Sequence, residues 1–248
     1  MLSYILRRLL IGVMVMLTVS LIAFALTNTA IDPARAIAGA GATSDDVEAI
    51  RKTYGFDKPL LARYAAWLGS ALTGDLGTSY RQRRPVVDII LERLPVTLTL
   101  GGLAFLFALA LSIPLAIAAA LHPNSWIDRV ALLLALFGQA MPTFWFALVG
   151  IVIFSVNLQW LPASGSSGLV HFILPSVALG YYAAPTMMRL TRAGMMEVLA
   201  SDYIRTARAK GLLEPAVVLK HALRNAVLPV VSVAAVQLGF MLGGSVVI

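Results

Sequence analysis

The side chains that most often carry out chemistry are few in this sequence and are poorly spaced for it. The three histidines, His122, His171 and His221, are far apart and share no ligand spacing. Cysteine is absent, which excludes a cysteine nucleophile and a thiolate metal site. The sequence has no GxxxxGKS/T loop for nucleotide phosphates and no GxSxG or HExxH pattern. We therefore predict that the chain is not an enzyme and holds no metal or cofactor of its own.

The composition predicts a membrane protein. Hydrophobic residues make up 59% of the 248 residues and charged residues only 12%, whereas about a quarter of a soluble domain is charged. A bilayer core needs about 20 apolar residues per helix. Long uncharged stretches predict an all-α polytopic membrane protein with five transmembrane helices, over residues 9–30, 96–121, 129–155, 171–190 and 226–248. A signal peptide is the alternative for the first stretch, but four further spans favour an uncleaved helix.

The distribution of charge predicts the orientation and the location. With the N-terminus in the cytoplasm, the inner loops carry ten basic and four acidic residues, and the outer segment carries nine basic and eight acidic residues. This asymmetry follows the positive-inside tendency. We expect a multi-pass protein of the cytoplasmic (inner) membrane with a cytoplasmic N-terminus. The net charge of +7 is spread over short loops, so it does not indicate nucleic acid as a partner.

Three regions follow from this topology: an N-terminal transmembrane helix in 1–31, an outer segment in 32–94 and a membrane core in 95–248. In the outer segment, Thr43, Ser44 and Asp45 are three candidate helix caps, and Asp46 and Glu48 place negative charge in the first turn. Residues 73–80 predict a glycine-containing turn, and 85–95 predict a short amphipathic helix before the second span. These small helices either form a functional cap on the outer surface or only pack around the helix bundle.

The spans contain mild polar groups and no acidic residue in their cores. Ion-coupled carriers usually place an ionisable residue at membrane depth, so an ion-coupled carrier or channel acting alone is the weaker alternative. Prolines that allow helices to bend are present at Pro114, Pro142, Pro175 and Pro185. The polar side chains either line a passage or only hydrogen-bond neighbouring helices. The candidates for the passage are Ser112, Gln139, Thr143, Ser176 and Gln237.

The loop at 189–225 contains several closely spaced signals for helices and their ends. Residues 197–210 predict a helix, and Gly211 predicts its end in a left-handed cap. Leu212 and Leu213 follow as exposed apolar residues, and Pro215 predicts the first turn of another helix. A short helix that ends in glycine suits a cleft on a soluble partner, although a merely solvated basic loop is the alternative.

This loop resembles the EAA loop of ABC importer permeases. Gly211 matches the family's glycine, and Arg205, Thr206 and Ala207 occupy its triplet, of which only the last alanine is retained. Leu223 and Arg224 stand at the later Leu-Pro position, without its proline. YIRTARAKG followed by HALRNAVLPV is similar to the variant in peptide and nickel importers. Residues 1–24 and 74–100 resemble the same family, so the likeness extends over essentially the whole chain.

The resemblance implies a type I permease fold and a set of partners. These are a second homologous permease subunit, two cytoplasmic ATPase subunits that bind ATP and Mg, an extracytoplasmic solute-binding protein and the lipid bilayer. The helix near 197–211 would be the coupling helix in the ATPase groove, and the turn at 122–129 would be a second contact. The coupling residues implied in this way are Glu197, Ser201, Asp202, Arg205, Ala207, Ala209, Gly211, Asn124 and Trp126.

The resemblance also sets two expectations about the cargo and the chain's end. The cargo is expected to be a peptide or a similar small solute, with nickel complexes left open, because selection is expected to lie largely in the binding protein. Permeases of this family continue with an outer loop and a sixth helix. This chain stops at Ile248 within an apolar run, so we expect a truncated subunit.

Overall fold

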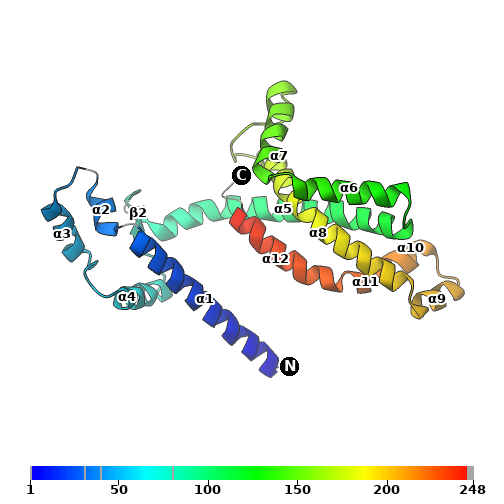
Figure 1. Cartoon of the computed structure of the whole chain (residues 1–248), viewed down its shortest axis with the longest axis horizontal. Coiled ribbons are helices and arrows are strands. Elements are labelled where there is room, and N and C mark those ends of the chain that lie inside the picture. The colour runs from blue at the N-terminus through cyan, green and yellow to red at the C-terminus, as the bar shows by residue number, and fades with distance from the viewer. Residues whose placement is uncertain (1, 31, 40, 80, 245–248) are drawn as a thin grey trace. The chain divides into compact units, whose positions relative to one another are not determined.

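Most of the chain is helical in the computed structural model, which describes residues 2–30, 32–39, 41–79 and 81–244 (Figure 1). Among these residues the strands are limited to a short antiparallel hairpin, β1 (Thr78–Ser79) with β2 (Arg84–Pro85). The chain divides into two compact units, residues 1–92 and 93–248. The predicted all-α membrane architecture is therefore confirmed.

The N-terminal unit consists of one long apolar helix followed by three short helices and the hairpin. These helices are α1 (Leu2–Ala30), α2 (Pro33–Ala38), α3 (Ser44–Thr53) and α4 (Leu60–Leu72). Of the three candidate caps for α3, Thr43 is the N-cap: its hydroxyl accepts the Asp46 backbone N–H, and the Asp46 carboxylate accepts the backbone N–H of Thr43. Hydrogen bonds from Thr43 hold the pKa of the Asp46 carboxyl below its ordinary value.

Helix α4 packs against the final third of α1 through polar and aromatic contacts. The Tyr64 hydroxyl lies 2.6 Å from the Ser20 hydroxyl, and Arg63 hydrogen-bonds the Asn28 side chain. The Phe24 ring lies 5.6 Å from the Tyr64 ring and 5.8 Å from the Trp67 ring. These contacts join α4 to α1 within the N-terminal unit.

A single long helix, α5 (Val86–Leu121), replaces the two elements that the sequence predicted at 85–95 and 96–121. Pro95 lies inside it without ending it. Proline removes only one backbone donor, and neighbouring groups in a membrane protein can satisfy the carbonyl that is left free. The prediction of a separate short helix at 85–95 is wrong.

The C-terminal unit is built from helices that pack lengthwise around α8 (Ile173–Leu199). The helices α6 (Trp126–Ala140) and α12 (Leu228–Gly244) run beside it (Figure 1). The remaining elements are α7 (Thr143–Gly150), a π-helical segment Ile151–Asn157, a 3-10 turn Leu169–Phe172, α9 (Asp202–Ala209), α10 (Glu214–Ala216), a second π-helical segment Val217–Ala222 and α11 (Leu223–Ala226).

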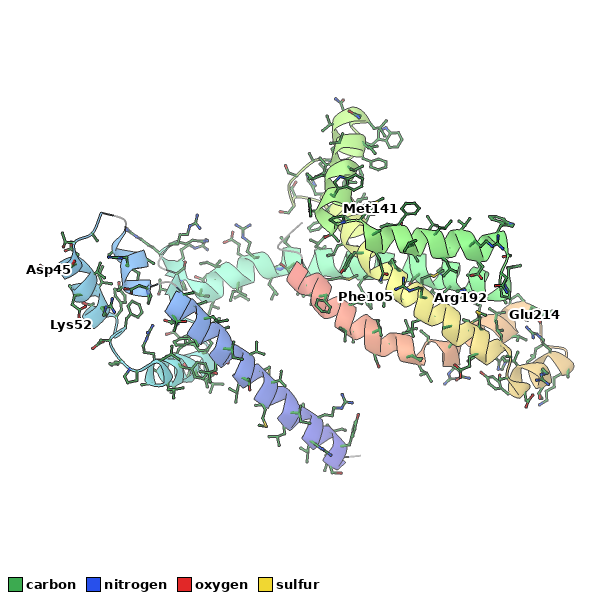
Figure 2. The ribbon with its side chains drawn as sticks, in the orientation of Figure 1. Asp45, Lys52, Phe105, Met141, Arg192 and Glu214 are labelled. Carbon is green, nitrogen blue, oxygen red and sulfur yellow. The ribbon has the colours of Figure 1, made fainter. Side chains whose placement is uncertain are left out.

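Among the described residues, three helices are long and apolar enough to cross a membrane by themselves, and five spans result only if two bent pairs are each counted as one. The segment Trp126–Asn157, predicted as a single span over 129–155, bends by 102° where α6 gives way to α7. Met141 lies at this bend (Figure 2). Pro142 follows it as the N-cap of α7, and the residue before a proline avoids the helical conformation. The second bent pair joins Glu214–Ala226 to Leu228–Gly243, and the angle between its two parts is 61°.

Glycines let the helices of this unit approach closely. A Cβ atom added to Gly194 of α8 would lie 2.7 Å from the backbone oxygen of Ala226 in α11. At Gly138 the added atom would lie 2.8 Å from a ring carbon of Pro185. Small residues at such crossings are the usual basis of helix packing in membranes.

The substitution Gly194→Ala should therefore destabilise the protein, although alanine is the better helix former. Overpacking against backbone costs about 1–3 kcal/mol, because the Ala226 carbonyl cannot move aside as a flexible side chain would. Thermal unfolding in detergent measures the effect. Gly102→Ala in α5 is the matched control, since its added Cβ would meet nothing within 4 Å; equal midpoints for the two variants would contradict the packing argument.

Candidate functional site

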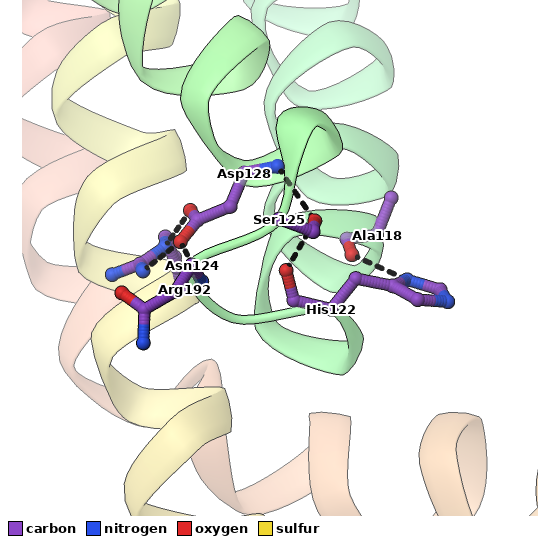
Figure 3. A network of polar contacts seen from close by, with 6 residues as sticks. All are labelled: Ala118, His122, Asn124, Ser125, Asp128 and Arg192. Atoms are coloured by element: carbon purple, nitrogen blue, oxygen red, sulfur yellow. Dashed lines mark hydrogen bonds and ion pairs between the residues drawn. The ribbon is translucent and has the colours of Figure 1, made fainter.

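The turn that joins α5 to α6 is held by a local hydrogen-bond network (Figure 3). Asn124 adopts a left-handed conformation with φ 61°, which asparagine tolerates better than most residues. Ser125 is the N-cap of α6: its hydroxyl donates to the His122 carbonyl oxygen at 2.5 Å and accepts the Asp128 N–H at 3.4 Å. The Asp128 carboxylate in turn accepts the Asn124 N–H at 3.0 Å.

A buried ion pair ties this turn to α8. The Arg192 guanidinium donates two hydrogen bonds of 2.6 Å to the two carboxylate oxygens of Asp128 (Figure 3). The Asp128 side chain is 4% exposed and the Arg192 side chain 20%. A two-point pair of this kind fixes orientation as well as distance. The position of the 122–129 turn therefore follows that of α8.

Asp128 and Arg192 are among the charges of the predicted inner loops, and their pairing was not predicted. The Ser125–Asp128 spacing carries a detectable helix-cap signal. The partner at 192 lies 64 positions away, and no local spacing reveals it.

Helix α8 continues nine residues beyond its predicted end at 190, and the predicted helix 197–210 is interrupted. Helix α8 ends at Leu199 and α9 begins at Asp202. Ser201 between them takes an extended conformation, with φ −75° and ψ 153°, as an N-cap residue does. The prediction of one continuous helix is wrong because serine at this place begins a new helix.

Helix α9 has one buried face and one exposed face. Ile204 is fully buried and Ala207 is 8% exposed, in a cluster with Met195 of α8 and Val217 and Ala222 of the following segment. Ala207 therefore anchors α9 and is not part of its outer face. The exposed side chains of α9 include Asp202, Arg205 and Ala209.

The predicted left-handed cap at Gly211 is confirmed. Gly211 has φ 76°, its N–H donates to the Arg208 carbonyl at 2.9 Å, and the Leu212 N–H donates to the Ala207 carbonyl at 3.3 Å. These two bonds form the Schellman motif that ends many helices. A Cβ atom at Gly211 would meet nothing within 4 Å. Leu213 beyond it is 77% exposed.

A second ion pair closes the segment after α9. Arg208 donates to both carboxylate oxygens of Glu214, at 2.7 and 3.2 Å. Glu214 precedes Pro215 in the first turn of α10, as the sequence predicted for that proline. The Arg208 guanidinium holds the pKa of the Glu214 carboxyl below its ordinary value.

The two predicted contacts for a partner border the same hollow. An open cavity of about 500 Å³ is lined by His122 of the turn, by Arg208 of α9 and by Glu214 and Leu219 of the next segment. Three other predicted coupling residues are exposed: Asn124, Trp126 (73% exposed) and Glu197. Ser201 is half-buried. The structure thus brings together segments that are about 80 residues apart in sequence.

The predicted passage residues differ in burial and in their neighbours within the described part of the chain. Ser112 and Ser176 are buried, and no hydrogen-bond partner is recorded for either hydroxyl within the described residues. Ser112 borders a cavity of about 20 Å³ whose lining includes none of the other four. Gln139 is exposed and donates to the Thr186 hydroxyl at 3.2 Å, while Thr143 and Gln237 are half-buried. Their role in a passage stays a prediction.

Comparison with known proteins identifies the kind of membrane protein that carries this surface. Residues 112–248 match the family described as the inner membrane component of binding-protein-dependent transport systems, and residues 1–101 match the N-terminal part of such components. The chain belongs to this family. Relatives named glutathione transport system permease protein GsiC, from Escherichia coli and Shigella dysenteriae, are 42% identical, and one from Salmonella typhi is 43% identical. Each alignment covers 100% of this chain and 81% of the relative.

Family membership establishes the general function of the chain. It is a transmembrane permease subunit of an ATP-driven importer in the inner membrane, and such a system includes a solute-binding protein and ATPase partners. The family is one of transport permeases and not of enzymes. The comparisons lend no support to an ion-coupled carrier. Within the part of the chain that the structure describes, no three His, Asp or Glu side chains are grouped so as to hold a metal ion.

Proposed function

We propose that partner ATPases drive this permease through a coupling surface made of the 122–129 turn, α9 and residues 210–214. The observation that carries the proposal is the burial pattern of α9: Ile204 and Ala207 anchor one face while Asp202 and Arg205 stay exposed on the other. A helix anchored in this way transmits a push to the helices beneath it. A solvated loop would only bend.

The Asp128–Arg192 pair extends this surface to the turn. Both the turn and α9 connect directly to α8, the first through the ion pair and the second through the two-residue break at Ala200–Ser201. Movement of an ATPase against either contact would therefore move α8. Nucleotide must bind differently to the two states of the transporter for this movement to have a direction.

The arrangement of partners is part of the same proposal. The N-terminus lies in the cytoplasm, a second homologous permease faces this one, and two ATPase subunits below them bind ATP and Mg. The excess of basic residues in the loops on the coupling side supports this orientation. This chain supplies no nucleotide site of its own.

The cargo is a small peptide or a similar solute, recognised first by the binding protein. The relatives named for glutathione transport favour a short peptide of that size. Uptake of labelled glutathione and dipeptides, measured with the complete set of partner subunits, distinguishes among these cargoes.

The absence of cysteine makes the coupling surface directly testable. Single cysteines in place of Asp202 and Asn124 should form crosslinks to the ATPase in the assembled transporter. A cysteine in place of Leu169 is the matched control, because it is 71% exposed at the opposite end of the α8 segment. Crosslinks from position 169 and none from 202 or 124 would disprove the proposed surface.

A further inference from the structure

The hairpin of the N-terminal unit presents two arginines without acidic partners to an open hollow. Arg81 and Arg83 line a cavity of about 1150 Å³ whose lining contains no acidic residue. The neighbouring Arg84 pairs with Glu92, and Arg51 pairs with Asp32. Within the described residues no ion pair is recorded for Arg81 or Arg83, and both are exposed. Their two positive charges are therefore available to a ligand.

The hairpin holds these arginines in a defined place. The Arg83 N–H donates to the Ser79 carbonyl at 2.7 Å, and the Val86 N–H closes the hairpin onto the Gly77 carbonyl at 2.9 Å. Arg83 has φ 51°, a left-handed conformation that is uncommon for residues other than glycine and points to a local function where it occurs.

The rest of the lining places the hollow at the edge of the bilayer. Thr27, in the last turn of α1, borders it together with the apolar residues Ile37 and Val86. The 29 residues of α1 span about 43 Å, which matches about 40–45 Å for a bilayer with its headgroups. The last turn of α1 therefore lies at headgroup level.

From this combination we infer that the hollow binds an anionic glycerophospholipid. Its phosphate lies between Arg81 and Arg83, the hydroxyls of Thr78 and Ser79 hydrogen-bond the headgroup, and an acyl chain follows Ile37 and Val86. Arginine suits phosphate because its guanidinium offers several donors in a plane. The solute-binding protein is the less suitable occupant, because the hollow is bordered by Thr27 in the last turn of the membrane helix α1. The site lies in the N-terminal unit and is independent of the coupling surface.

The experiment measures lipid retained by the purified full-length protein. The protein is reconstituted in bilayers of phosphatidylcholine with phosphatidylglycerol and extracted with detergent. Native mass spectrometry then identifies the lipid that stays bound to it. We expect preferential retention of phosphatidylglycerol, and roughly thirtyfold weaker retention by Arg81→Gln/Arg83→Gln, from the usual contribution of basic residues at an anionic surface. A photoactivatable phosphatidylglycerol should label the peptide that contains residues 78–86.

Two further variants separate binding from folding. Arg35→Gln removes one positive charge from an exposed residue of α2 that does not line the hollow, and its retention should equal that of the unmodified protein. Arg81→Lys/Arg83→Lys keeps the charge on the same hairpin and should restore most of the binding. We expect the thermal unfolding midpoint of each of the three variants to equal that of the unmodified protein.

Three outcomes would overturn the inference. The first is equal retention of the two lipids, or no effect of the double glutamine variant. The second is displacement of the lipid by millimolar inorganic phosphate, which would assign the site to a free anion. The third is loss of binding-protein association in the double glutamine variant with lipid retention unchanged, which would assign the arginines to that protein.

Discussion

The substitution Arg192→Met should lower the free energy of unfolding by about 3–5 kcal/mol, because it leaves the Asp128 carboxylate buried without its partner. The carboxylate is only 4% exposed, so water cannot replace the guanidinium. The loss should also uncouple the 122–129 turn from α8 and abolish uptake. Thermal unfolding in detergent and ATP-driven uptake in vesicles measure the two effects.

The double variant Asp128→Asn/Arg192→Met provides the decisive comparison. Its asparagine keeps an oxygen that accepts the Asn124 N–H, and no charge is left buried. It should therefore be more stable than Arg192→Met alone, with an interaction energy within about 0.5–3 kcal/mol. Arg208→Met is the control, since it breaks an exposed pair with Glu214 that solvent screens, and its effect on stability should be small. Additive losses in the double variant would show that the pair does not hold the turn.

The elements that the sequence predicted well are those whose signals are local. Helix caps at Thr43 and Gly211 and the first turn at Pro215 depend on a few neighbouring residues, and all three are present. The apolar stretches likewise predicted membrane helices, because length and hydropathy alone decide whether a helix can cross a bilayer.

The elements that the sequence predicted poorly depend on tertiary contacts or on competing local signals. Pro95 was expected to separate two helices, yet α5 continues through it. Pro142 was only one of four prolines named as allowing a helix to bend, yet the chain bends by 102° beside it. A proline permits a kink, and the packing of the neighbouring helices decides whether the kink occurs.

The candidate site shows the same division. Its exposed residues lie near the predicted cap and turn, so local patterns and the family resemblance located them. Burial of Ala207 and the pairing of Asp128 with Arg192 were not predicted, because both depend on segments that meet only in the folded chain. The resemblance placed Ala207 in a motif but could not say which way its side chain points.

The substitution Gly211→Leu should abolish uptake while leaving insertion and folding nearly intact. Within the chain the added side chain meets open space, so its cost is limited to the left-handed backbone, about 1–2 kcal/mol. The larger effect comes from the coupling surface, where a leucine side chain would stand between α9 and the ATPase. Uptake, ATPase co-purification and thermal midpoint are measured together.

The matched control for Gly211 lies in the same chain, at the end of α4. Gly74 has φ 90° and open space around its Cβ position, and its helix ends in the same pair of hydrogen bonds, from Gly74 to Ala71 and from Asp75 to Ser70, both 3.0 Å. Gly74→Leu therefore carries the same backbone strain away from the coupling surface. It should lower the midpoint as much as Gly211→Leu does but leave ATPase binding and uptake unchanged. Gly211→Asn, which tolerates the left-handed conformation, should keep partial uptake. Equal loss of uptake in the two leucine variants would attribute the effect to strain, and normal uptake with Gly211→Leu would remove α9 from the coupling surface.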